Sequence, residues 1–238
     1  MRVLVLIAAL VPAAAGNLVD VRATPTLTGA RLRIAVKQEN GAGNVRRFAI
    51  VHEQPLHLWV VGEGLEFFAH EHPAAQPDGV FMVDLALPRP GPYMAIVEFQ
   101  PDPGAPQMVH QAFTTGSAFG RLARPSIDTA PKIVDGVRVT IDAAKMKAGE
   151  RQPLVVRFDD AATGAAVTDL EPYLGAAAHL LAVSTDLTEA VHDHPAPDLR
   201  GAAIAFNPLL PRAGVMKVWI QFQRGGKVGT APFVIDVP

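Results

Sequence analysis

Cysteine is absent from this chain of 238 residues. Without it the protein can form no disulfide, has no thiolate to bind a metal ion or act as a nucleophile, and lacks the attachment point of a bacterial lipid anchor. The chain also has no Gly-x-Ser-x-Gly turn and no Gly-rich phosphate loop. These absences argue against the common hydrolase and nucleotide-binding classes.

Charge of one sign is not concentrated anywhere in the sequence. Lys and Arg number 21 against 23 Asp and Glu, for a formal net charge of −2, and no dense basic run occurs. We therefore expect no nucleic-acid partner and no binding to an anionic membrane surface. Beyond the first residues no apolar stretch reaches the roughly 20 residues of a transmembrane helix, so no such segment is expected in the mature protein.

The first 15 residues have the pattern of a secretory signal peptide. A basic Arg2 precedes a short apolar run, which ends in the Ala-x-Ala site at Ala13 to Ala15. Cleavage there would leave Gly16 as the first mature residue. The pattern predicts a periplasmic or secreted protein.

What the chain does contain favours an all-β fold. Hydrophobic residues make up 49% of it, enough for packed cores, and 21 Pro and 20 Gly separate short apolar runs. Alternation predicts strands at 31–36, 48–51, 56–61, 81–85, 93–99 and 109–113, and again at 137–141, 154–158, 179–183, 202–206, 215–222 and 233–237.

The chain contains an internal repeat. His57, His70, His72 and Pro73 form a His-x12-His-x-His-Pro motif, which recurs 122 residues later as His179, His192, His194 and Pro195. Two leucines and a valine coincide as well, in the pairs Leu58/Leu180, Leu65/Leu187 and Val61/Val183. Only 8 of the residues are histidine, so three histidines that recur at identical spacing indicate a duplicated domain.

Each copy has the strand spacing of an immunoglobulin-like β-sandwich. The sequence therefore predicts two tandem Ig-like β-sandwich domains after the signal peptide of residues 1–15. The domains are expected at residues 16–115 and 132–238, joined by a linker at 116–131 where no periodic pattern is present.

The repeated histidines are candidate metal ligands. In an extended backbone, residues two apart point to the same side, so His70 and His72 can face one centre, as can His192 and His194. His57 and His179, each within an apolar strand, are the candidate third ligands. Three neutral imidazoles suit copper, zinc or nickel, and a fourth position would stay open.

A structural role is the alternative for the same residues. The repeated motif can be a corner in which imidazoles donate to backbone carbonyls and proline shapes the turn. Glu71 and Asp193 are expected to face away from the paired histidines as solvated charges. His52 and His110 lie outside the repeat, and we expect them to be surface residues, although either can complete a site in the first domain.

The motif strings resemble a known family. Residues 55–61 with 70–73, and 172–175 with 179–183 and 192–195, look like the repeated Ig-like domains of secreted bacterial proteins associated with copper and heavy-metal efflux, the YtkA-like group. The resemblance covers most of both halves and implies an Ig-like sandwich with a link to heavy-metal resistance. The second half keeps the family's Ser-x-Asp-Leu at 184–187, whereas residues 62–65 read Gly-Glu-Gly-Leu, so we expect the first loop to differ in shape.

Two functions follow from these patterns. The leading hypothesis is a periplasmic metal-binding protein, for copper first and zinc second, that buffers ions or passes them to an envelope exporter or another periplasmic protein. The alternative is a metal-free Ig-like adaptor that contacts an envelope protein and uses its histidines for the fold. No catalytic residues are assigned: His192, Asp193 and His194 are the residue types of an iron oxygenase site, but adjacent strand residues face opposite sides.

Overall fold

The structure is a computed structural model that describes residues 18–26, 29–38, 42–116, 123–195 and 202–238. These residues form strands, turns and loops, and none of them belongs to a helix that would be capable of spanning a bilayer. The predicted signal peptide at 1–15, with its cleavage before Gly16, lies outside the described residues, as does part of the predicted linker.

The first half of the chain forms a sandwich of two antiparallel sheets, which we call the first sandwich. Its outer sheet has the order β1-β2-β6-β5 and its inner sheet the order β4-β3-β7-β8. The strands are β1 (Val19–Thr26), β2 (Gly29–Val36), β3 (Leu56–Gly62), β4 (Phe68–Glu71), β5 (Ala74–Ala75), β6 (Val80–Ala86), β7 (Pro92–Phe99) and β8 (Gln107–Thr114).

The second half forms the second sandwich on the same plan. Its outer sheet has the order β14-β11-β10-β9 and its inner sheet the order β13-β12-β15-β16. The strands are β9 (Lys132–Val134), β10 (Val137–Asp142), β11 (Leu154–Asp160), β12 (His179–Ser184), β13 (Ala190–Asp193), β14 (Ala203–Phe206), β15 (Gly214–Arg224) and β16 (Lys227–Val237). The predicted all-β fold of Ig-like sandwiches is confirmed.

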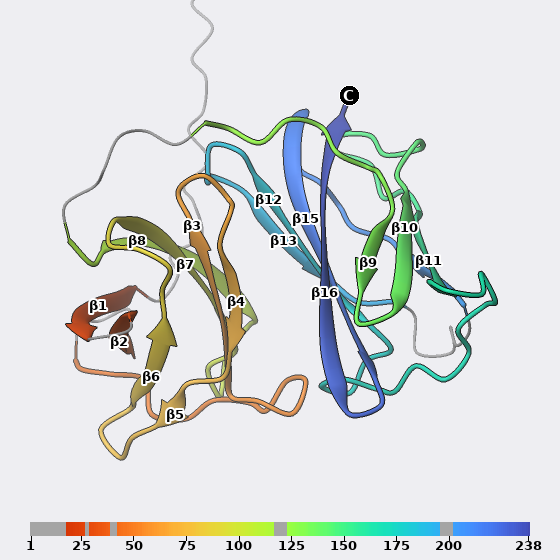
Figure 1. The fold of residues 1–238 in the computed structure, drawn as a ribbon. Helices are drawn as coiled ribbons and strands as arrows, with labels where there is room; N and C mark the ends of the chain where they lie inside the picture. Colours follow the sequence, from red (N-terminus) through yellow and green to blue (C-terminus); the bar gives the residue numbers. More distant parts are fainter. Residues whose placement is uncertain (1–17, 27–28, 39–41, 117–122, 196–201) are drawn as a thin grey trace, which may run out of the picture.

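The inner sheets of the two sandwiches pack against each other (Figure 1). Strand β3 is therefore buried on both faces: Leu56, Leu58 and Val60 belong to the core of the first sandwich, while Trp59 and Val61 face the second. Strand β12 is buried along its whole length in the same way. This double burial explains why both motif strands read as nearly continuous apolar runs.

A third hydrophobic core fills the contact between the inner sheets, and we call it the interdomain core. It contains both tryptophans of the chain. Trp59 lies opposite Ile96 in the first sandwich, whereas at the equivalent positions of the second Leu181 lies opposite Trp219. At this position each inner sheet thus contributes one tryptophan and one smaller side chain. The tryptophan is on the motif strand β3 in the first sandwich and on the neighbouring strand β15 in the second.

The repeated leucines shape the turn that follows each motif strand. Leu65 and Leu187 both have a left-handed backbone, with φ of 59° and 62°, and each donates its N–H to the carbonyl three residues earlier. Such a conformation is strained for leucine, but both side chains pack into the interdomain core. The expected difference in shape is not found in the turn itself, because the same two backbone hydrogen bonds close it in both copies: Gly62 to Phe67 and Leu65 to Gly62, and Ser184 to Glu189 and Leu187 to Ser184.

The strand prediction is wrong at residues 48–51 and misses five strands, which are β1, β4, β5, β9 and β13. Residues 48–51 form only isolated bridges, Phe48 to Pro101 and Val51 to Gln54. Strands β4 and β13, which carry the second histidine of each motif, were not predicted. They are four residues long and have polar residues at positions buried by the other sandwich, so they show no amphipathic alternation.

The interdomain core yields a stability prediction. Trp219 is 4% exposed within it, whereas Ile133 on β9 is 66% exposed. We expect Trp219→Ala to lower the free energy of unfolding by about 3–5 kcal/mol, because it leaves a cavity between the sheets. The control Ile133→Ala should stay within about 0.5 kcal/mol of the parent. Denaturant unfolding followed by circular dichroism measures both; equal midpoints for the two variants would contradict the packing described.

Candidate metal centre

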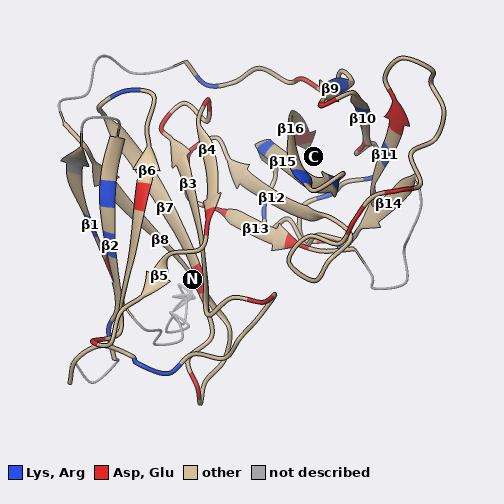
Figure 2. Ribbon diagram, turned by 60° about the horizontal axis from the view of Figure 1, so that its bottom comes forward, with Lys and Arg blue, Asp and Glu red and all other residues tan. Residues whose placement is uncertain are grey.

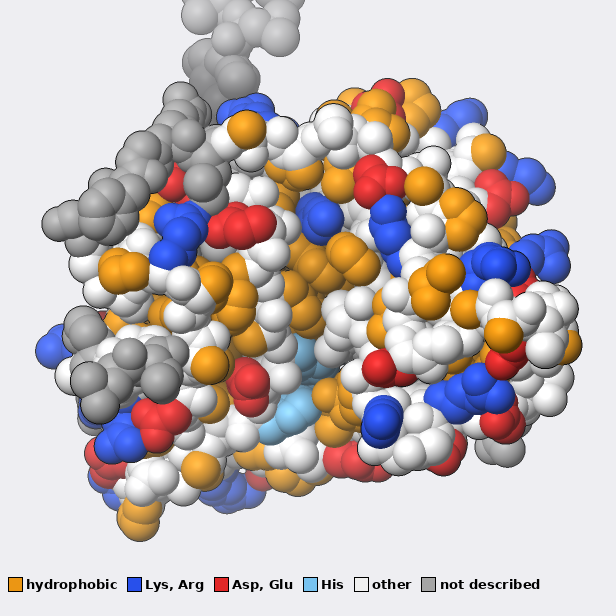
Figure 3. Space-filling model, viewed as in Figure 1, with side chains coloured by type: hydrophobic (Ala, Val, Ile, Leu, Met, Phe, Trp, Pro, Cys, Tyr) orange, Lys and Arg blue, Asp and Glu red, His pale blue; other side chains and the backbone are white. Residues whose placement is uncertain are grey.

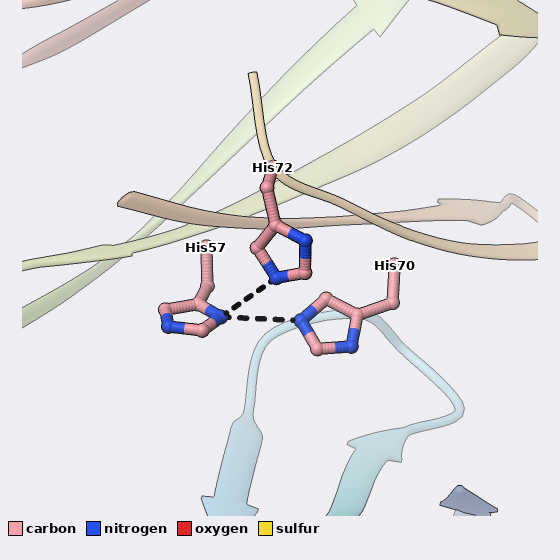
Figure 4. A group of neighbouring side chains, drawn as sticks. All are labelled: His57, His70 and His72. Atoms are coloured by element: carbon pink, nitrogen blue, oxygen red, sulfur yellow. Dashed lines mark hydrogen bonds between the residues drawn. The ribbon is translucent and has the colours of Figure 1, made fainter. Parts of the chain in front are cut away.

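The first motif brings three histidines together on the face of the inner sheet that meets the other sandwich. His57 lies on β3, and antiparallel pairing of β4 with β3 sets His70 opposite Trp59, one strand away. His72 follows the end of β4 and turns back toward the same point (Figure 4). We call His57, His70 and His72 the first trio.

The nitrogens of the first trio have the spacing of metal ligands. His57 Nδ1 lies 3.3 Å from His70 Nε2 and 3.2 Å from His72 Nε2, and all three atoms are within 4.8 Å of one another. Metal–nitrogen bonds of 2.0–2.1 Å at tetrahedral angles separate their donor atoms by roughly 3.3 Å. The trio could therefore hold a metal ion.

The second motif builds the same arrangement, which we call the second trio. His179 Nδ1 lies 3.3 Å from His192 Nε2 and 2.8 Å from His194 Nε2. The same three ring nitrogens converge as in the first trio. The structure therefore brings together all six predicted ligands as two groups of three.

Hydrogen bonds on the far side of the rings set the tautomers of the first trio. His57 Nε2 donates to the Val51 carbonyl over 3.0 Å, and His70 Nδ1 donates to the side-chain oxygen of Gln221 over 2.7 Å. Both oxygens only accept, so in each neutral ring the single proton is on the outer nitrogen. The inner nitrogens, His57 Nδ1 and His70 Nε2, therefore face each other as lone pairs.

This arrangement leaves at least two of the three inner nitrogens as acceptors, which is compatible with a bound cation. Of the three inner nitrogens, only that of His72 can carry a proton while the outer bonds are kept, and that proton can serve only one contact. A metal ion at the centre accepts all three lone pairs at once. Outer hydrogen bonds of this kind are also how metal-bound histidines are usually oriented.

The second trio has equivalent outer bonds with one difference. His179 Nε2 donates to the Tyr173 carbonyl over 2.7 Å, and His192 Nδ1 donates to the carboxylate of Glu98 over 2.7 Å. Glu98 belongs to the first sandwich, just as Gln221, the acceptor of the first trio, belongs to the second. Each trio is thus supported by a side chain of the other sandwich.

Burial keeps these imidazoles neutral. Desolvation lowers the pKa of His70 to about 2 and those of His72 and His179 to about 4. The pKa values of His57, His192 and His194 are also lowered, again chiefly by desolvation. Metal binding requires the neutral form, so protons compete poorly for these rings.

The two trios are neighbours. The ring centroids of His57 and His192 are 6.2 Å apart, those of His70 and His179 are 6.1 Å apart, and the Trp59 ring lies 4.6 Å from His70 and 4.5 Å from His192. Histidine side chains reach the surface in the hollow between the two sandwiches (Figure 3). Two ions bound here would share one interdomain centre.

His52 lies beside this centre, which corrects the expectation of a surface residue. Its ring stacks at a tilt on His194, with centroids 3.9 Å apart, and it is half-buried. With His194 it lines a pocket of about 540 Å³ whose other walls include Leu170, Glu171 and Ala176. The pocket therefore borders the second trio at His194. The repeat did not reveal His52, because Leu174 occupies its position in the second copy.

His110 also differs from expectation. It is half-buried on β8, where burial lowers its pKa, and it contacts Thr188 and Glu189 of the second sandwich. It therefore belongs to the interdomain contact and does not complete the first trio.

The acidic residues between the paired histidines face away from them, as expected, but they are not fully solvated. Asp193 accepts the backbone N–H of Asn207 over 2.8 Å, on the side opposite to the contact of His192 with Glu98. Burial raises the pKa of both Glu71 and Asp193. Elsewhere charged residues are scattered over strands and loops (Figure 2).

Comparison with known proteins assigns no activity. Residues 132–238 match a family described as a domain of unknown function (DUF8832). No curated protein is significantly similar to the chain. Three solved structures illustrate the β-sandwich likeness.

Domains 4 and 5 of the S-layer protein SbsC are 13% identical, with 89% of this chain and 84% of that one covered and a TM-score of 0.28. The chicken CNTN1 FN1–FN3 domains are 9% identical, covering 92% and 66%, with a TM-score of 0.23. A carbohydrate-binding module of the β-sandwich superfamily is 10% identical, covering 94% and 100%, with a TM-score of 0.24. At these scores the likenesses carry no functional argument.

The lowered histidine pKa values predict acid sensitivity of the metal-free protein. In the unfolded chain the pKa of these rings is about 6.5, whereas burial in the folded protein lowers the pKa of His70 to about 2 and that of His179 to about 4. Below pH 6.5 the unfolded state therefore takes up protons that the folded state excludes, so stability falls from about pH 6.5 to about 4 through both rings and on to about 2 through His70. Urea unfolding at a series of pH values measures this. A His70→Gln, His179→Gln variant should show a shallower decline; an unchanged slope would contradict the assignment.

Proposed function

We propose that this protein binds one transition-metal ion in each histidine trio, with copper as the favoured ion and zinc as its competitor. The observation that carries the proposal is the convergence of unprotonated ring nitrogens, set by outer hydrogen bonds to oxygens that only accept. Desolvation of an imidazole without a partner is costly, and a bound ion offsets that cost.

The proposed role is to hold and hand over ions rather than to catalyse a reaction. Each trio supplies three ligands, which leaves a coordination position for a ligand from a partner. Both groups lie at the hollow between the sandwiches, and the pocket beside His52 and His194 borders the second. We propose an envelope metal exporter, or another periplasmic protein, as the recipient.

Copper is proposed over zinc on the resemblance of the motif strings to the YtkA-like group of copper- and heavy-metal-associated proteins. The ligand set itself suits both ions, because three imidazoles bind copper and zinc alike. A role in heavy-metal resistance follows from the same resemblance and is part of the proposal.

A metal titration of tag-free protein tests the proposal. His70→Ala with His72→Ala removes the first trio, His192→Ala with His194→Ala removes the second, and the four changes together remove both. We expect the Cu(II) or Zn(II) stoichiometry to fall from about two to about one to zero across the series, since each ion needs at least three protein ligands. Isothermal calorimetry counts the ions and circular dichroism checks folding.

His110→Ala is the matched control, because it removes an interdomain histidine outside both trios; it should leave two ions bound. If the parent protein binds no ion, or the combined variant binds as the parent does, the histidines are structural and the metal-free adaptor becomes the better account.

Export is a separate part of the proposal. In a native host the mature chain should begin at Gly16 and appear in the soluble periplasmic fraction, because the first 15 residues have the basic, apolar and Ala-x-Ala regions of a signal peptide. N-terminal sequencing of the fractionated protein checks this. A mature chain that retains Met1 would refute the signal peptide.

A further inference from the structure

The residues that support the trios occupy equivalent places in the two sandwiches. Glu98 on β7 pairs in register with His57, and Gln221 on β15 pairs in register with His179. Each side chain nevertheless crosses the contact between the inner sheets: Glu98 accepts from His192 and Gln221 accepts from His70. Each sandwich therefore supplies the side chain that accepts the outer hydrogen bond of the other sandwich's trio.

The two acceptors differ in charge. Glu98 offers a carboxylate and Gln221 a neutral amide. Each accepts a hydrogen bond over 2.7 Å from the Nδ1 atom of the second histidine of a motif, His192 for Glu98 and His70 for Gln221. A carboxylate acceptor makes the imidazole a stronger metal ligand, because it stabilises the positive charge that the ring takes on when its other nitrogen binds a cation. An amide oxygen does this less well. The first ligand shells are alike, so this contrast distinguishes the trios.

The amide of Gln221 is held in place by the second sandwich. Its nitrogen donates to the Thr230 hydroxyl on β16 over 3.2 Å, which turns its oxygen toward His70. A glutamate at this position would keep the same contacts, because the threonine hydroxyl can donate to a carboxylate as readily as it accepts from an amide. Exchange of the two acceptors is therefore close to isosteric at both places.

We infer that the two trios are unequal sites, with the second trio binding its ion more tightly because Glu98 of the first sandwich supports His192. Glu98 is a positioning residue that acts through His192. This inference rests on the proposed metal binding and adds an order to it: His179, His192 and His194 fill first and hold their ion, and His57, His70 and His72 fill second and release theirs first. The identity of the residues at 98 and 221 sets that order.

Variants that retain only one trio measure the affinity of each metal site separately. His70→Ala with His72→Ala leaves only the second trio and its bond to Glu98, while His192→Ala with His194→Ala leaves only the first and its bond to Gln221. Zn(II) is titrated against a chromophoric chelator at fixed pH in both. We expect the second trio to bind Zn(II) about 10- to 100-fold more tightly, the usual effect of an outer-shell partner.

Exchange of the acceptors is the decisive variant. Glu98→Gln should weaken Zn(II) binding at the second trio by that factor, and Gln221→Glu should strengthen Zn(II) binding at the first. The double exchange should reverse the order of the two affinities, while the net charge and composition of the protein stay the same. Glu98 also lies near His57, so Glu98→Gln is measured on the first trio as well, where the through-space effect should be smaller. The melting temperature of each metal-free variant controls for folding.

The outcomes separate the two proposals. Equal affinities of the trios, or an order that survives the double exchange in folded protein, would overturn this inference and leave metal binding intact. Loss of Zn(II) binding that follows unfolding of the exchanged protein would show that 98 and 221 serve the fold, which also overturns it. Failure of the unmodified protein to bind any ion would overturn both.

Discussion

The face-to-face packing of the two inner sheets is the constraint on which the rest of this structure depends. It buries the second face of β3 and β12, which the sandwiches alone would leave in water, and it brings Trp59 and Trp219 into one interdomain core. It also removes the trios from bulk solvent, so that the pKa values of all six histidines are lowered by desolvation. Without this contact each trio would lie on an exposed sheet and lose an outer hydrogen-bond partner.

Burial of neutral histidines is costly unless their polar atoms are satisfied, and the fold satisfies them unevenly. The outer nitrogens of His57 and His179 donate to carbonyls of equivalent loops, those of Val51 and Tyr173. The inner nitrogens have only one another, at distances that suit a shared cation. The outer hydrogen bonds thus leave His72 and His194 as the donors among the inner nitrogens, over 3.2 Å to His57 and 2.8 Å to His179. With so few donors among the inner nitrogens, each trio could hold a metal ion at its centre.

Duplication explains why the arrangement is reciprocal, and later divergence explains why it is not symmetric. Two copies of one sheet that pack through the same face give each copy the partner residues of the other, as Glu98 and Gln221 show. Substitutions in one copy then act on the site of the other. His52 is a second case: it lies in the first sandwich but stacks on His194 of the second, and its counterpart is Leu174.

The sequence by itself determined the fold class and the composition of each trio. Alternation between Pro- and Gly-rich turns predicts most strands, and the repeated spacing of histidine identifies the residues that converge, because strand geometry relates spacing directly to direction. Only the tertiary structure decided what surrounds them. The bond of His192 to Glu98 joins residues 94 apart and that of His70 to Gln221 joins residues 151 apart, and no local pattern encodes which faces of two sheets will meet. Strands β4 and β13 were missed for the same reason: their polar positions are buried by the other sandwich, so hydrophobic periodicity gave no sign of them.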